Sequence, residues 1–431
     1  MSRGCRTILF LMYLAVISFP VVIMFLLGVQ YEEPLLVKMG KVTGLAGFSI
    51  LVLEVALSGR IKALDRAFGL DRVMLFHRRM GIAAAILLAT HPLLLSIGMQ
   101  DFSLLGLETG WQVMLGKGAL VGLFLAASGG ILMGRGPIDH IVARFFHSKL
   151  AGGVVVLAFV HGLVTGSDME TLGVKSACWI LFALFVGLVS FRQLMARYGS
   201  KVRFVVDSVK EETEKTWTLV LSPTADGIPD YAAGQFCFWR ILSNRRKPEE
   251  HPFTIASSPT QKEAVTVTIK ASGNFTQHIH EVQKGDQVLC EGPFGRFGAN
   301  LDEAKSFLFL AAGVGITPIM SMLRFLRDTQ DSRQIVLIDQ NRTERNIVFR
   351  EELDRMPATV KVVHVLSRPG TNWTGAKGYV TTDLLREHAS DILQTADIYV
   401  CGPPQMMKSV VKILRALGIG KSRIHTERFT L

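Results

Sequence analysis

Four histidines form two pairs with the same separation inside long apolar stretches: His77 with His91, and His147 with His161. Fourteen residues make almost four helical turns, about 21 Å of rise, so both members of a pair lie near one face of a helix. Ionisable residues inside a membrane are costly and mark function. Two such helices side by side would present two levels of paired imidazoles, each able to hold a haem iron from both sides. We therefore predict two b-type haems with these four histidines as iron ligands.

The segments that must position these histidines are apolar and long enough to cross a bilayer. The chain has 431 residues and a mean hydropathy of +0.33, and its long uncharged runs fall within residues 1–195. We expect six spans, with one histidine pair on the third and one on the fifth. These two spans run in the same direction, so His77 should be level with His147, and His91 with His161. The predicted spans cover about residues 8–29, 41–58, 78–97, 113–133, 149–166 and 176–191.

Basic residues gather in alternate loops between the predicted spans, while the other loops are mainly acidic. By the positive-inside rule, both termini and the polar second half lie in the cytoplasm, which for a bacterial chain implies the inner membrane. The net charge of +11 is therefore partly a topology signal. The sequence contains no basic stripe interleaved with aromatic residues, which is the pattern that would indicate nucleic-acid binding. The five cysteines are scattered, without a CxxC motif or a CxxCH motif for covalent haem attachment.

A few further polar residues near the spans have two interpretations each. Arg78 and Arg79 follow His77, where they could pair with haem propionates or serve as interface charges. Glu54 is a charge inside a span, close to its end, and could be a proton or substrate contact. His140 lies in a basic loop, and its expected role is that of a solvated residue.

Residues 200–300 show short β-runs broken by turn residues, at 203–209, 217–221, 235–241 and 265–270, for which a barrel is the natural closure. One stretch inside this region is His251-Pro252-Phe253-Thr254, followed by Ile-Ala-Ser257-Ser258. An aromatic ring flanked by hydroxyls can face a flat ring and bond its polar edge. A second stretch, Gly273-Asn-Phe275-Thr276, opens a short helical run and would offer backbone N–H groups to a pyrophosphate. The alternatives are an ordinary strand end and a helix cap.

From residue 301 the pattern changes to alternating strands and helices. Strands are expected at 307–311, 334–338, 361–366 and 397–400, and helices from 316 to about 327, at 346–356 and at 404–417. This pattern predicts a parallel, doubly wound sheet that binds its ligand at the carboxyl ends of the strands. The first strand runs into Gly313-Val-Gly315-Ile-Thr317-Pro318. The proline excludes the Rossmann GxGxxG fingerprint, although the glycines still permit close approach by a dinucleotide phosphate.

Taken together, the motifs resemble those of the ferric reductase and NADPH oxidase superfamily over essentially the whole chain. The histidine pairs resemble its haem ligands, and the run from His251 to Thr254 resembles its flavin motif, with Phe253 near the isoalloxazine and Thr254 bonding it. Gly273 to Thr276 resembles its FAD-pyrophosphate turn. The glycine turn and Cys401-Gly402-Pro403-Pro404 resemble the nucleotide elements of ferredoxin–NADP reductases, where the cysteine lies by the nicotinamide. Glu427-Arg428-Phe429 resembles the C-terminal aromatic segment that shields the flavin, with Phe429 as the shielding ring.

The resemblance implies three domains: a six-span α-helical haem-binding bundle (1–197), an FAD-binding β-barrel domain (198–300) and an NAD(P)H-binding α/β domain (301–431). Ser367-Arg368, after the third strand, resembles the pair that grips the 2′-phosphate of NADPH, and Arg342 would assist. NADH is the alternative to NADPH as the electron donor. No calcium-binding or other regulatory extension is recognisable, so a minimal member of the superfamily is expected.

The expected activity is electron transfer from cytoplasmic NADPH, through FAD and then the two haems, to an acceptor outside. Cys401, Phe429 and Thr254 are the candidate catalytic residues. Because haem with two histidine ligands has no open position, the acceptor should react at the haem edge. Oxygen, giving superoxide, is the first candidate acceptor, and a ferric chelate is the second. Donation to a quinone or a periplasmic protein, and a non-enzymatic haem sensor, are further alternatives.

Overall fold

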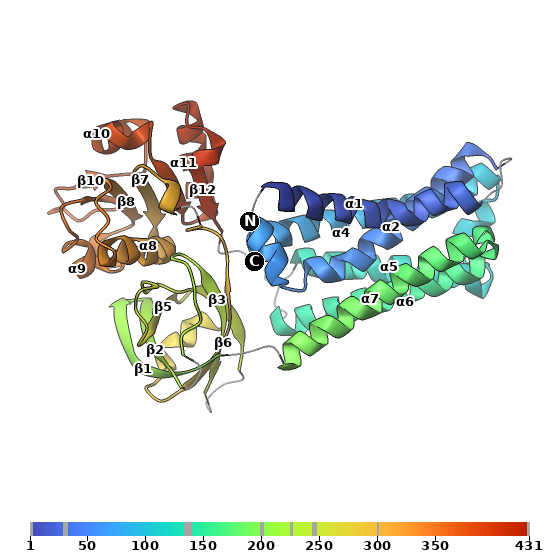
Figure 1. Ribbon diagram of the computed structural model, residues 1–431, viewed down its shortest axis with the longest axis horizontal. Helices are drawn as coiled ribbons and strands as arrows, with labels where there is room; N and C mark the ends of the chain where they lie inside the picture. Colours follow the sequence, from blue (N-terminus) through green and yellow to red (C-terminus); the bar gives the residue numbers. More distant parts are fainter. Residues whose placement is uncertain are drawn as a thin grey trace. The chain divides into compact units, whose positions relative to one another are not determined.

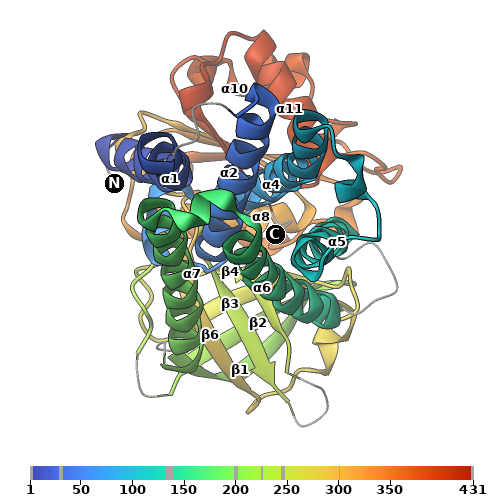
Figure 2. The same cartoon turned by 90° about the vertical axis from the view of Figure 1, so that its right-hand side faces the viewer.

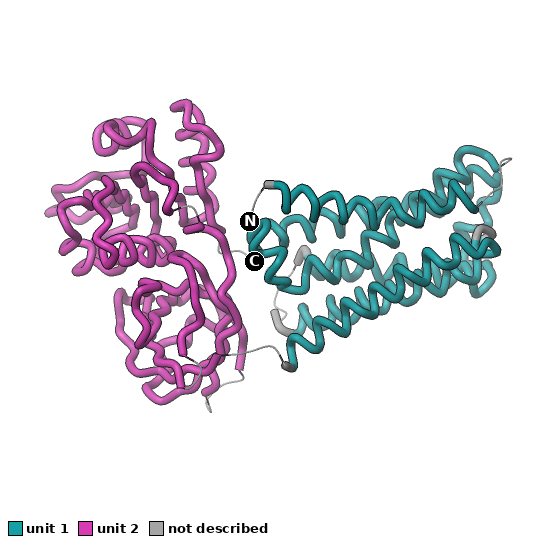
Figure 3. The backbone as a smooth tube through the Cα atoms, viewed as in Figure 1, with its two compact units in different colours: residues 1–199 teal, residues 200–431 magenta. Residues whose placement is uncertain are grey.

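The computed structural model describes residues 3–28, 33–132, 140–198, 202–224, 227–243, 248–299 and 301–428. The chain divides into two compact units, residues 1–199 and 200–431 (Figure 3). Two separate sheets lie within the second unit. The further division of this unit into a flavin domain (198–300) and a nucleotide domain (301–431) remains our proposal.

The first unit is a bundle of long apolar helices (Figures 1 and 2). Six helices in its described part are long and apolar enough to cross a membrane, which confirms the number of predicted spans. The long helices are α1 (Arg3–Ile23, extended by the π-helical turn Met24–Gly28), α2 (Leu35–Leu57), α4 (Leu70–Met99), α5 (Trp111–Leu132), α6 (His140–Thr165) and α7 (Leu172–Tyr198). The short ones are α3 (Lys62–Phe68) and the 3₁₀ turns Phe102–Leu105 and Ser167–Glu170.

Two antiparallel helix pairs, α2 with α4 and α5 with α6, make the most extensive contacts of the bundle. Glycines on α2 allow the first pair to approach closely. A Cβ at Gly40 would lie 2.9 Å from Cδ2 of Leu95, and a Cβ at Gly47 would lie 2.6 Å from Cγ of Leu88. Small residues at such contacts are the usual means of packing helices in lipid, where apolar burial provides little driving force.

The first sheet of the second unit is antiparallel, with strand order β4-β3-β6-β1-β2-β5. The four predicted β-runs are confirmed as β1, β2, β3 and β5, whereas β4 and β6 were not predicted. β4 contains Pro252, which a central strand would not tolerate, but β4 stands at the end of the strand order. The strands are β1 (Val202–Thr213), β2 (Thr216–Pro223), β3 (Phe236–Leu242), β4 (Glu250–Thr254), β5 (Val265–Lys270) and β6 (Gln287–Phe294).

The predicted closed barrel is not confirmed. The two end strands of the described sheet are connected by one antiparallel bridge, between Ile255, just after β4, and Val267 in β5. The interior is nevertheless packed, with Phe204, Trp239 and Ile269 buried in one apolar cluster. We therefore describe a six-stranded β-domain and keep full closure as a prediction.

The second sheet is parallel throughout, as the strand–helix alternation predicted. Its strand order is β10-β9-β8-β7-β11-β12, of which β10 and β12 were not predicted. Apolar clusters cover both of its faces: α8 and α9 pack on one, and α10 and α11 on the other (Figure 1). The strands are β7 (Phe307–Ala312), β8 (Ile335–Asn341), β9 (Val360–Leu366), β10 (Ala376–Lys377), β11 (Asp397–Cys401) and β12 (Ile424–Glu427). The helices are α8 (Ile316–Asp328), α9 (Arg350–Leu353), α10 (Thr382–Leu393) and α11 (Pro404–Ala416).

The helix predicted at 346–356 was wrong in extent. Phe349 has a left-handed backbone (φ 58°), which interrupts a right-handed helix and leaves a 3₁₀ turn before it and the four-residue α9 after it. The aromatic side chain is buried, so core packing has prevailed over local helical preference.

Candidate functional site

The four histidines on α4 and α6 lie in the two predicted pairs. The ring centroids of His77 and His147 are 6.4 Å apart, and those of His91 and His161 are also 6.4 Å apart. The rings within each pair are nearly perpendicular, with interplanar angles of 88° and 84°. We call these pairs the His77/His147 level and the His91/His161 level.

Each imidazole has its Nδ1 against an acceptor on a neighbouring helix. Nδ1 of His91 lies 2.8 Å from the carbonyl oxygen of Gly40, and Nδ1 of His161 lies 2.9 Å from that of Gln112. Nδ1 of His147 lies 2.8 Å from the carbonyl oxygen of Ala126. Because a carbonyl oxygen only accepts, Nδ1 must carry the proton in all three rings, which leaves Nε2 free to bind a metal.

The fourth ring, His77, has a different partner. Its Nδ1 contacts the carboxylate of Glu54 on α2. Both side chains are largely removed from solvent, with exposed fractions of 20% and 11%. A carboxylate is also an acceptor, so the tautomer with Nε2 available is favoured here too.

Glycines make room for three of the rings. A Cβ at Gly44 would lie 2.8 Å from Nδ1 of His91, and one at Gly116 would lie 2.7 Å from Cε1 of His161. At Gly130 the nearest ring atom is Cε1 of His147, at 3.2 Å. The side chain of a helical residue covers the turn that precedes it, so a glycine uncovers the carbonyl oxygen four residues earlier. Gly44, Gly116 and Gly130 stand four residues after Gly40, Gln112 and Ala126 respectively.

The two levels suit haem iron. With an iron about 2.0 Å from each Nε2, and Nε2 about 1.1 Å from the ring centre, two facing rings would have centres roughly 6.2 Å apart. The observed 6.4 Å agrees with this spacing. Among the described residues, no group of three or more His, Cys, Asp and Glu side chains could hold a metal ion. A haem needs only two protein ligands, so the paired rings remain the candidate haem sites.

The predicted flavin residues lie on the edge strand β4 and in the turn after it. The ring of His251 stacks on that of Phe275, with centroids 4.2 Å apart, and Phe253 lies beyond, 6.5 Å from Phe275. Pro252 and Thr254 occupy the same strand, paired with Phe238 and Phe236 of β3. The structure thus brings the motif at 251–254 together with Phe275, which is distant in sequence.

The hydroxyl of Ser257 is already engaged within the β-domain. It accepts a hydrogen bond from the backbone N–H of Thr266 at 3.1 Å and lies 3.1 Å from the hydroxyl of Tyr231. The side chain is fully buried. Its predicted bond to a cofactor therefore stays a prediction, while its role in fixing the turn after β4 is established.

The turn at Gly273 closes on itself. The hydroxyl of Thr276 accepts hydrogen bonds from the N–H groups of Ser272 and Gly273, both at 2.9 Å. The predicted helical run is a six-residue 3₁₀ helix, Thr276–Glu281. Thr276 thus shapes the turn that the sequence assigned to a pyrophosphate, while two of the N–H groups there are already bonded.

The predicted dinucleotide elements meet where the order of the parallel sheet reverses. β7 lies between β8 and β11, so the chain leaves β7 in one direction and returns to its other side. Such a switch point, at the carboxyl ends of the strands, is where doubly wound sheets bind ligands. The turn from Gly313 to Pro318 follows β7. Cys401 is the last residue of β11, and Gly402 and Pro403 come directly after it.

Glycines let these two turns touch. A Cβ at Gly315 would overlap the carbonyl oxygen of Cys401, and one at Gly402 would lie 3.0 Å from Cβ of Ala312. Gly313 has a left-handed backbone, with φ 55°. Thr317 is buried and donates a hydrogen bond to the carbonyl oxygen of Val314 at 3.0 Å, which closes the first turn of α8.

The thiol of Cys401 is fully buried, beside Glu427 of the paired strand β12. Burial raises the pKa of Cys401 well above its usual range, and the Glu427 carboxylate raises it further. The thiol is therefore neutral and unreactive near pH 7. Phe429, which the sequence placed over the flavin, lies outside the described residues.

The residues predicted to bind a 2′-phosphate converge. The N–H of Arg368 donates to the carbonyl oxygen of Arg342 at 2.7 Å, and the N–H of Ser367 donates to that of Asn341 at 3.0 Å. Both arginines are exposed, at the neighbouring ends of β8 and β9. The Ser367 hydroxyl donates to the carbonyl oxygen of Asn341 at 3.4 Å. Guanidinium groups bind phosphate by charge-assisted hydrogen bonds, so the two arginine positions suit such a ligand.

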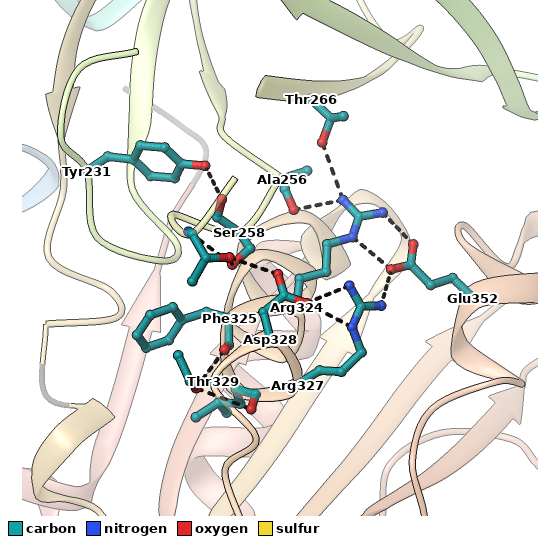
Figure 4. A network of polar contacts seen from close by, with 12 residues as sticks. Tyr231, Ala256, Ser258, Thr266, Arg324, Phe325, Arg327, Asp328, Thr329 and Glu352 are labelled. Carbon is teal, nitrogen blue, oxygen red and sulfur yellow. Dashed lines mark hydrogen bonds and ion pairs between the residues drawn. The ribbon is translucent and has the colours of Figure 1, made fainter. Parts of the chain in front are cut away.

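A polar network joins the β-domain to the first helix of the parallel sheet (Figure 4). Arg324 of α8 donates to the carbonyl oxygen of Ala256 at 2.8 Å and to both carboxylate oxygens of Glu352, at 2.9 Å and 2.5 Å. Asp328 accepts from Thr260 at 2.9 Å. This network, centred on Arg324, fixes the turn after the flavin motif relative to the dinucleotide turn.

Three family models match successive parts of the chain. Residues 43–136 match "Ferric reductase like transmembrane component", residues 219–297 match "FAD-binding domain", and residues 309–412 match "Oxidoreductase NAD-binding domain". The chain has the ferric reductase/NADPH oxidase-like architecture. A ferric reductase-type transmembrane component precedes a dehydrogenase part of the ferredoxin–NADP reductase kind.

The curated relatives match less than half of this chain. The chain is 32% identical to a glycine betaine monooxygenase reductase subunit of Pseudomonas aeruginosa over 191 residues, 42% of this chain and 52% of that protein. It is 37% identical to a nitrate reductase [NADPH] of Aspergillus niger over 175 residues, 37% of this chain and 20% of that protein. The chain thus spans about half the length of the first relative and a fifth of the second. Together with the family models, these similarities support an NAD(P)H oxidoreductase.

A solved structure gives a likeness of fold alone. The flavohemoglobin of Malassezia yamatoensis, with bound FAD and heme, is 18% identical, with a TM-score of 0.50 over 90% of this chain and 96% of that one. At this identity the likeness concerns the arrangement of elements and not the residues of a site.

Sequence reasoning missed the acceptors and glycines that hold the histidines. The sequence does carry a signal for these acceptors and glycines, because they repeat the separation of fourteen residues that the histidines show. Gln112 and Ala126, and likewise Gly116 and Gly130, are fourteen residues apart, as His147 and His161 are. The Arg324 network left no such signal, because its partners Ala256, Thr266 and Glu352 come from three separate segments.

Proposed function

We propose that the chain is a transmembrane flavocytochrome b, which passes electrons from NADPH through FAD and two b-type haems to molecular oxygen, forming superoxide. The observation that supports this most is the pair of histidine levels, each with ring centroids 6.4 Å apart and Nδ1 atoms already engaged. These levels occur in one chain with FAD-binding and NAD-binding domains. Transmembrane NAD(P)H-driven electron transfer accounts for both.

The soluble residues would hold the two nucleotides. Phe253, with His251 and Phe275, offers aromatic faces for a flavin ring, and Thr254 offers a hydroxyl at its edge. Gly313 and Gly315 allow a pyrophosphate to approach the backbone at the switch point. The neutral thiol of Cys401 would lie by the nicotinamide. Arg342, Ser367 and Arg368 would bind the 2′-phosphate, which favours NADPH over NADH.

When bound, FAD accepts two electrons together as a hydride, and haem accepts them singly. The role of the membrane residues is to engage Nδ1 of each imidazole, so that Nε2 is available to a haem at two points along the bundle. Because each level uses both rings as ligands, the acceptor would react without binding iron. For each NADPH oxidised, two oxygen molecules would become two superoxide ions, with release of one proton.

A ferric chelate is the second candidate acceptor, favoured by the match to a ferric reductase-like transmembrane component. Donation to a quinone or a periplasmic protein uses the same residues up to the His91/His161 level. The alternating loop charges support placement of the dehydrogenase part and both termini in the cytoplasm, with the bundle in a bacterial inner membrane.

The test is NADPH oxidation by the detergent-purified chain with added FAD. Haem reduction, superoxide dismutase-sensitive cytochrome c reduction and ferrous iron formation are recorded in parallel. Haem reduction with a dismutase-sensitive signal is the expected result. Fast ferric-chelate reduction with little superoxide would instead identify a metal reductase. Bound haem that NADPH and FAD fail to reduce would contradict the proposed electron path.

A further inference from the structure

The two antiparallel helix pairs of the bundle hold their histidines by one repeated arrangement. On α5 the acceptors Gln112 and Ala126 are fourteen residues apart, and they face His161 and His147 of α6, also fourteen apart. On α2 the positions facing His91 and His77 are Gly40 and Glu54, again fourteen apart. Position 54 is thus the counterpart of three positions whose backbone carbonyl oxygens accept a histidine proton.

The arrangement changes at Glu54. A glycine follows four residues after each of the other three acceptors, but here the residue is Ser58. The carbonyl oxygen of Glu54 accepts the N–H of Ser58 at 3.0 Å, at the end of α2. In its place the side chain supplies the acceptor, and the carboxylate contacts Nδ1 of His77. Three imidazoles thus have a backbone carbonyl oxygen at Nδ1, and the fourth has a side-chain carboxyl group there.

The surroundings of Glu54 strengthen this contact. Its carboxylate has an exposed fraction of 11% and lies near Gly81, where a Cβ would be 3.8 Å from Oε2. Tyr13 of α1 is its electrostatic neighbour, and the Tyr13 ring packs edge-on against Phe76 at 5.2 Å. In so apolar a site a charge acts on its partner far more strongly than it would in water.

The identity of an acceptor at Nδ1 alters a ligating imidazole. A carboxylate draws the Nδ1 proton more strongly than a carbonyl does, which raises the basicity of Nε2 toward a metal. Hydrogen bonding around the ligands and local charge are two means by which a protein sets a haem potential. A stronger hydrogen bond at Nδ1 and a nearby negative charge would both favour the oxidised, more positive iron.

We propose that Glu54 positions His77 and lowers the reduction potential of the haem at the His77/His147 level relative to that at the His91/His161 level. This inference rests on the proposed function, because it requires a haem at each level. The two levels would then differ in driving force although their ring spacing is the same. Electrons entering at the His77/His147 level would move downhill to the other.

The test is a spectroelectrochemical titration of the purified holoprotein, with haem content measured alongside. In Glu54→Gln the amide oxygen can still accept from Nδ1, so geometry is retained while the charge is lost. The lower midpoint should rise, with a change of roughly tenfold in the ratio of reduced to oxidised haem, or about 59 mV for one electron. The upper midpoint should not move. Glu54→Asp should restore part of the difference.

The matched control is Ser49→Ala, a buried polar residue of the same helix whose hydroxyl donates to the carbonyl oxygen of Leu45 at 2.9 Å. Neither midpoint should move in this variant. In a His91→Ala background, which removes the other level, the shift caused by Glu54→Gln should persist.

The outcomes separate this inference from the proposed function. Equal shifts of both midpoints, or none, in a Glu54→Gln protein with two haems would overturn the inference alone. A loss of haem in Glu54→Gln without a shift in the haem that remains would also overturn it, because that is the result of a purely structural role. If the unaltered chain binds no haem when haem is supplied, the proposed function fails and this inference fails with it.

Discussion

The first unit (residues 1–199), called here the membrane unit, and the second unit (residues 200–431), called the soluble unit, hold their site residues by different means. In the bundle, single hydrogen bonds from imidazoles to backbone carbonyls fix three of the four histidines. In the soluble unit, strand ladders and a charged network centred on Arg324 hold the turns. Both units use glycines for close approach, at Gly44 and Gly116 in one and at Gly315 in the other. In this chain the bundle residues are thus held by a few single bonds, whereas the turns of the second unit are held by many.

The largest effect should come from removing a histidine of the bundle. His91→Ala should lower haem from two per chain to one and reduce transmembrane electron transfer by more than ~100-fold, because the ligand itself is lost. NADPH-dependent reduction of ferricyanide by the soluble unit should persist, since that reaction needs only FAD. Haem content and the two activities measure this. Equal loss of both activities would show that the two units are not functionally separable.

The next largest effect should come from adding a side chain where a histidine ring contacts a backbone carbonyl oxygen. Gly116→Ala would place a Cβ 2.7 Å from Cε1 of His161, so the ring must move and haem affinity should fall by about 10–100-fold. Gly118→Ala, on the same helix with open space around its Cβ, is the control and should leave haem affinity unchanged. The measurement is haem retention during dilution. Identical retention in both variants would refute the role of the uncovered carbonyl oxygen.

The matching change in the soluble unit should be somewhat smaller. In Gly315→Ala the new Cβ would overlap the carbonyl oxygen of Cys401, and relieving this overlap should cost about 2 kcal/mol, or about 30-fold in kcat/KM for NADPH. Gly370→Ala, which meets nothing within 4 Å, serves as the control. Haem content should stay at the value of the unaltered chain. An unchanged kcat/KM would remove the β7–β11 switch point from consideration as the nucleotide site.

Coenzyme preference should change by about tenfold. Arg368→Ala removes one guanidinium from the proposed 2′-phosphate site, so kcat/KM for NADPH should fall about tenfold while that for NADH is retained. Arg386→Ala, an exposed arginine of α10, should change neither value. Steady-state kinetics with both coenzymes measure the ratio. Parallel losses with NADPH and NADH would place Arg368 outside the 2′-phosphate site.

The smallest effect concerns the network and its pH dependence. Burial raises the pKa of Glu352, but bonds from Arg324 and Arg327 outweigh it, so the pKa is lowered overall. A carboxyl group with a lowered pKa in the folded state stabilises the protein above its unfolded pKa of about 4.3. That stabilisation is lost as pH falls through the lower, folded value.

Glu352→Gln should therefore lower the stability of the soluble unit by about 1 kcal/mol at pH 7, and by progressively less below about pH 4. Thermal release of FAD, followed by its fluorescence at each pH, measures this. The control is Glu387→Gln on α10, where the carboxylate is 72% exposed. A deficit that stays constant down to pH 3 would mean that charge is not the cause.

The histidine levels could be predicted because polar residues are rare in the spans, so four histidines at one repeated separation stand out. The sequence could not reveal which atoms hold Nδ1, because a backbone carbonyl is present at every residue. Only the glycine four residues later marks an accessible one, and that is visible once the helix pairing is known. The sequence shows that Glu54 lies inside a span, but its partner depends on the antiparallel alignment of α2 and α4.

In the soluble unit the parallel character of the second sheet followed from the alternation of strands and helices, whereas the strand order, the short strands β10 and β12 and the local detail did not. Phe349 has a left-handed backbone and a buried ring, and this conformation shortens the predicted helix. The hydroxyl of Ser257 predicted a contact with a cofactor, yet it already bonds to Thr266 and Tyr231. In both cases tertiary contacts determined the conformation or the partner of a residue, against the expectation from its local sequence.

The hydrogen bonds at Nδ1 also bear on the order of assembly. The three bonds to backbone carbonyls require no iron, so the helix pairs α2/α4 and α5/α6 can reach their final registers in lipid before any cofactor arrives. Haem loading would then be insertion between rings that already present Nε2, rather than folding around a metal. Biogenesis of the bundle would depend on the supply of haem only at its last step.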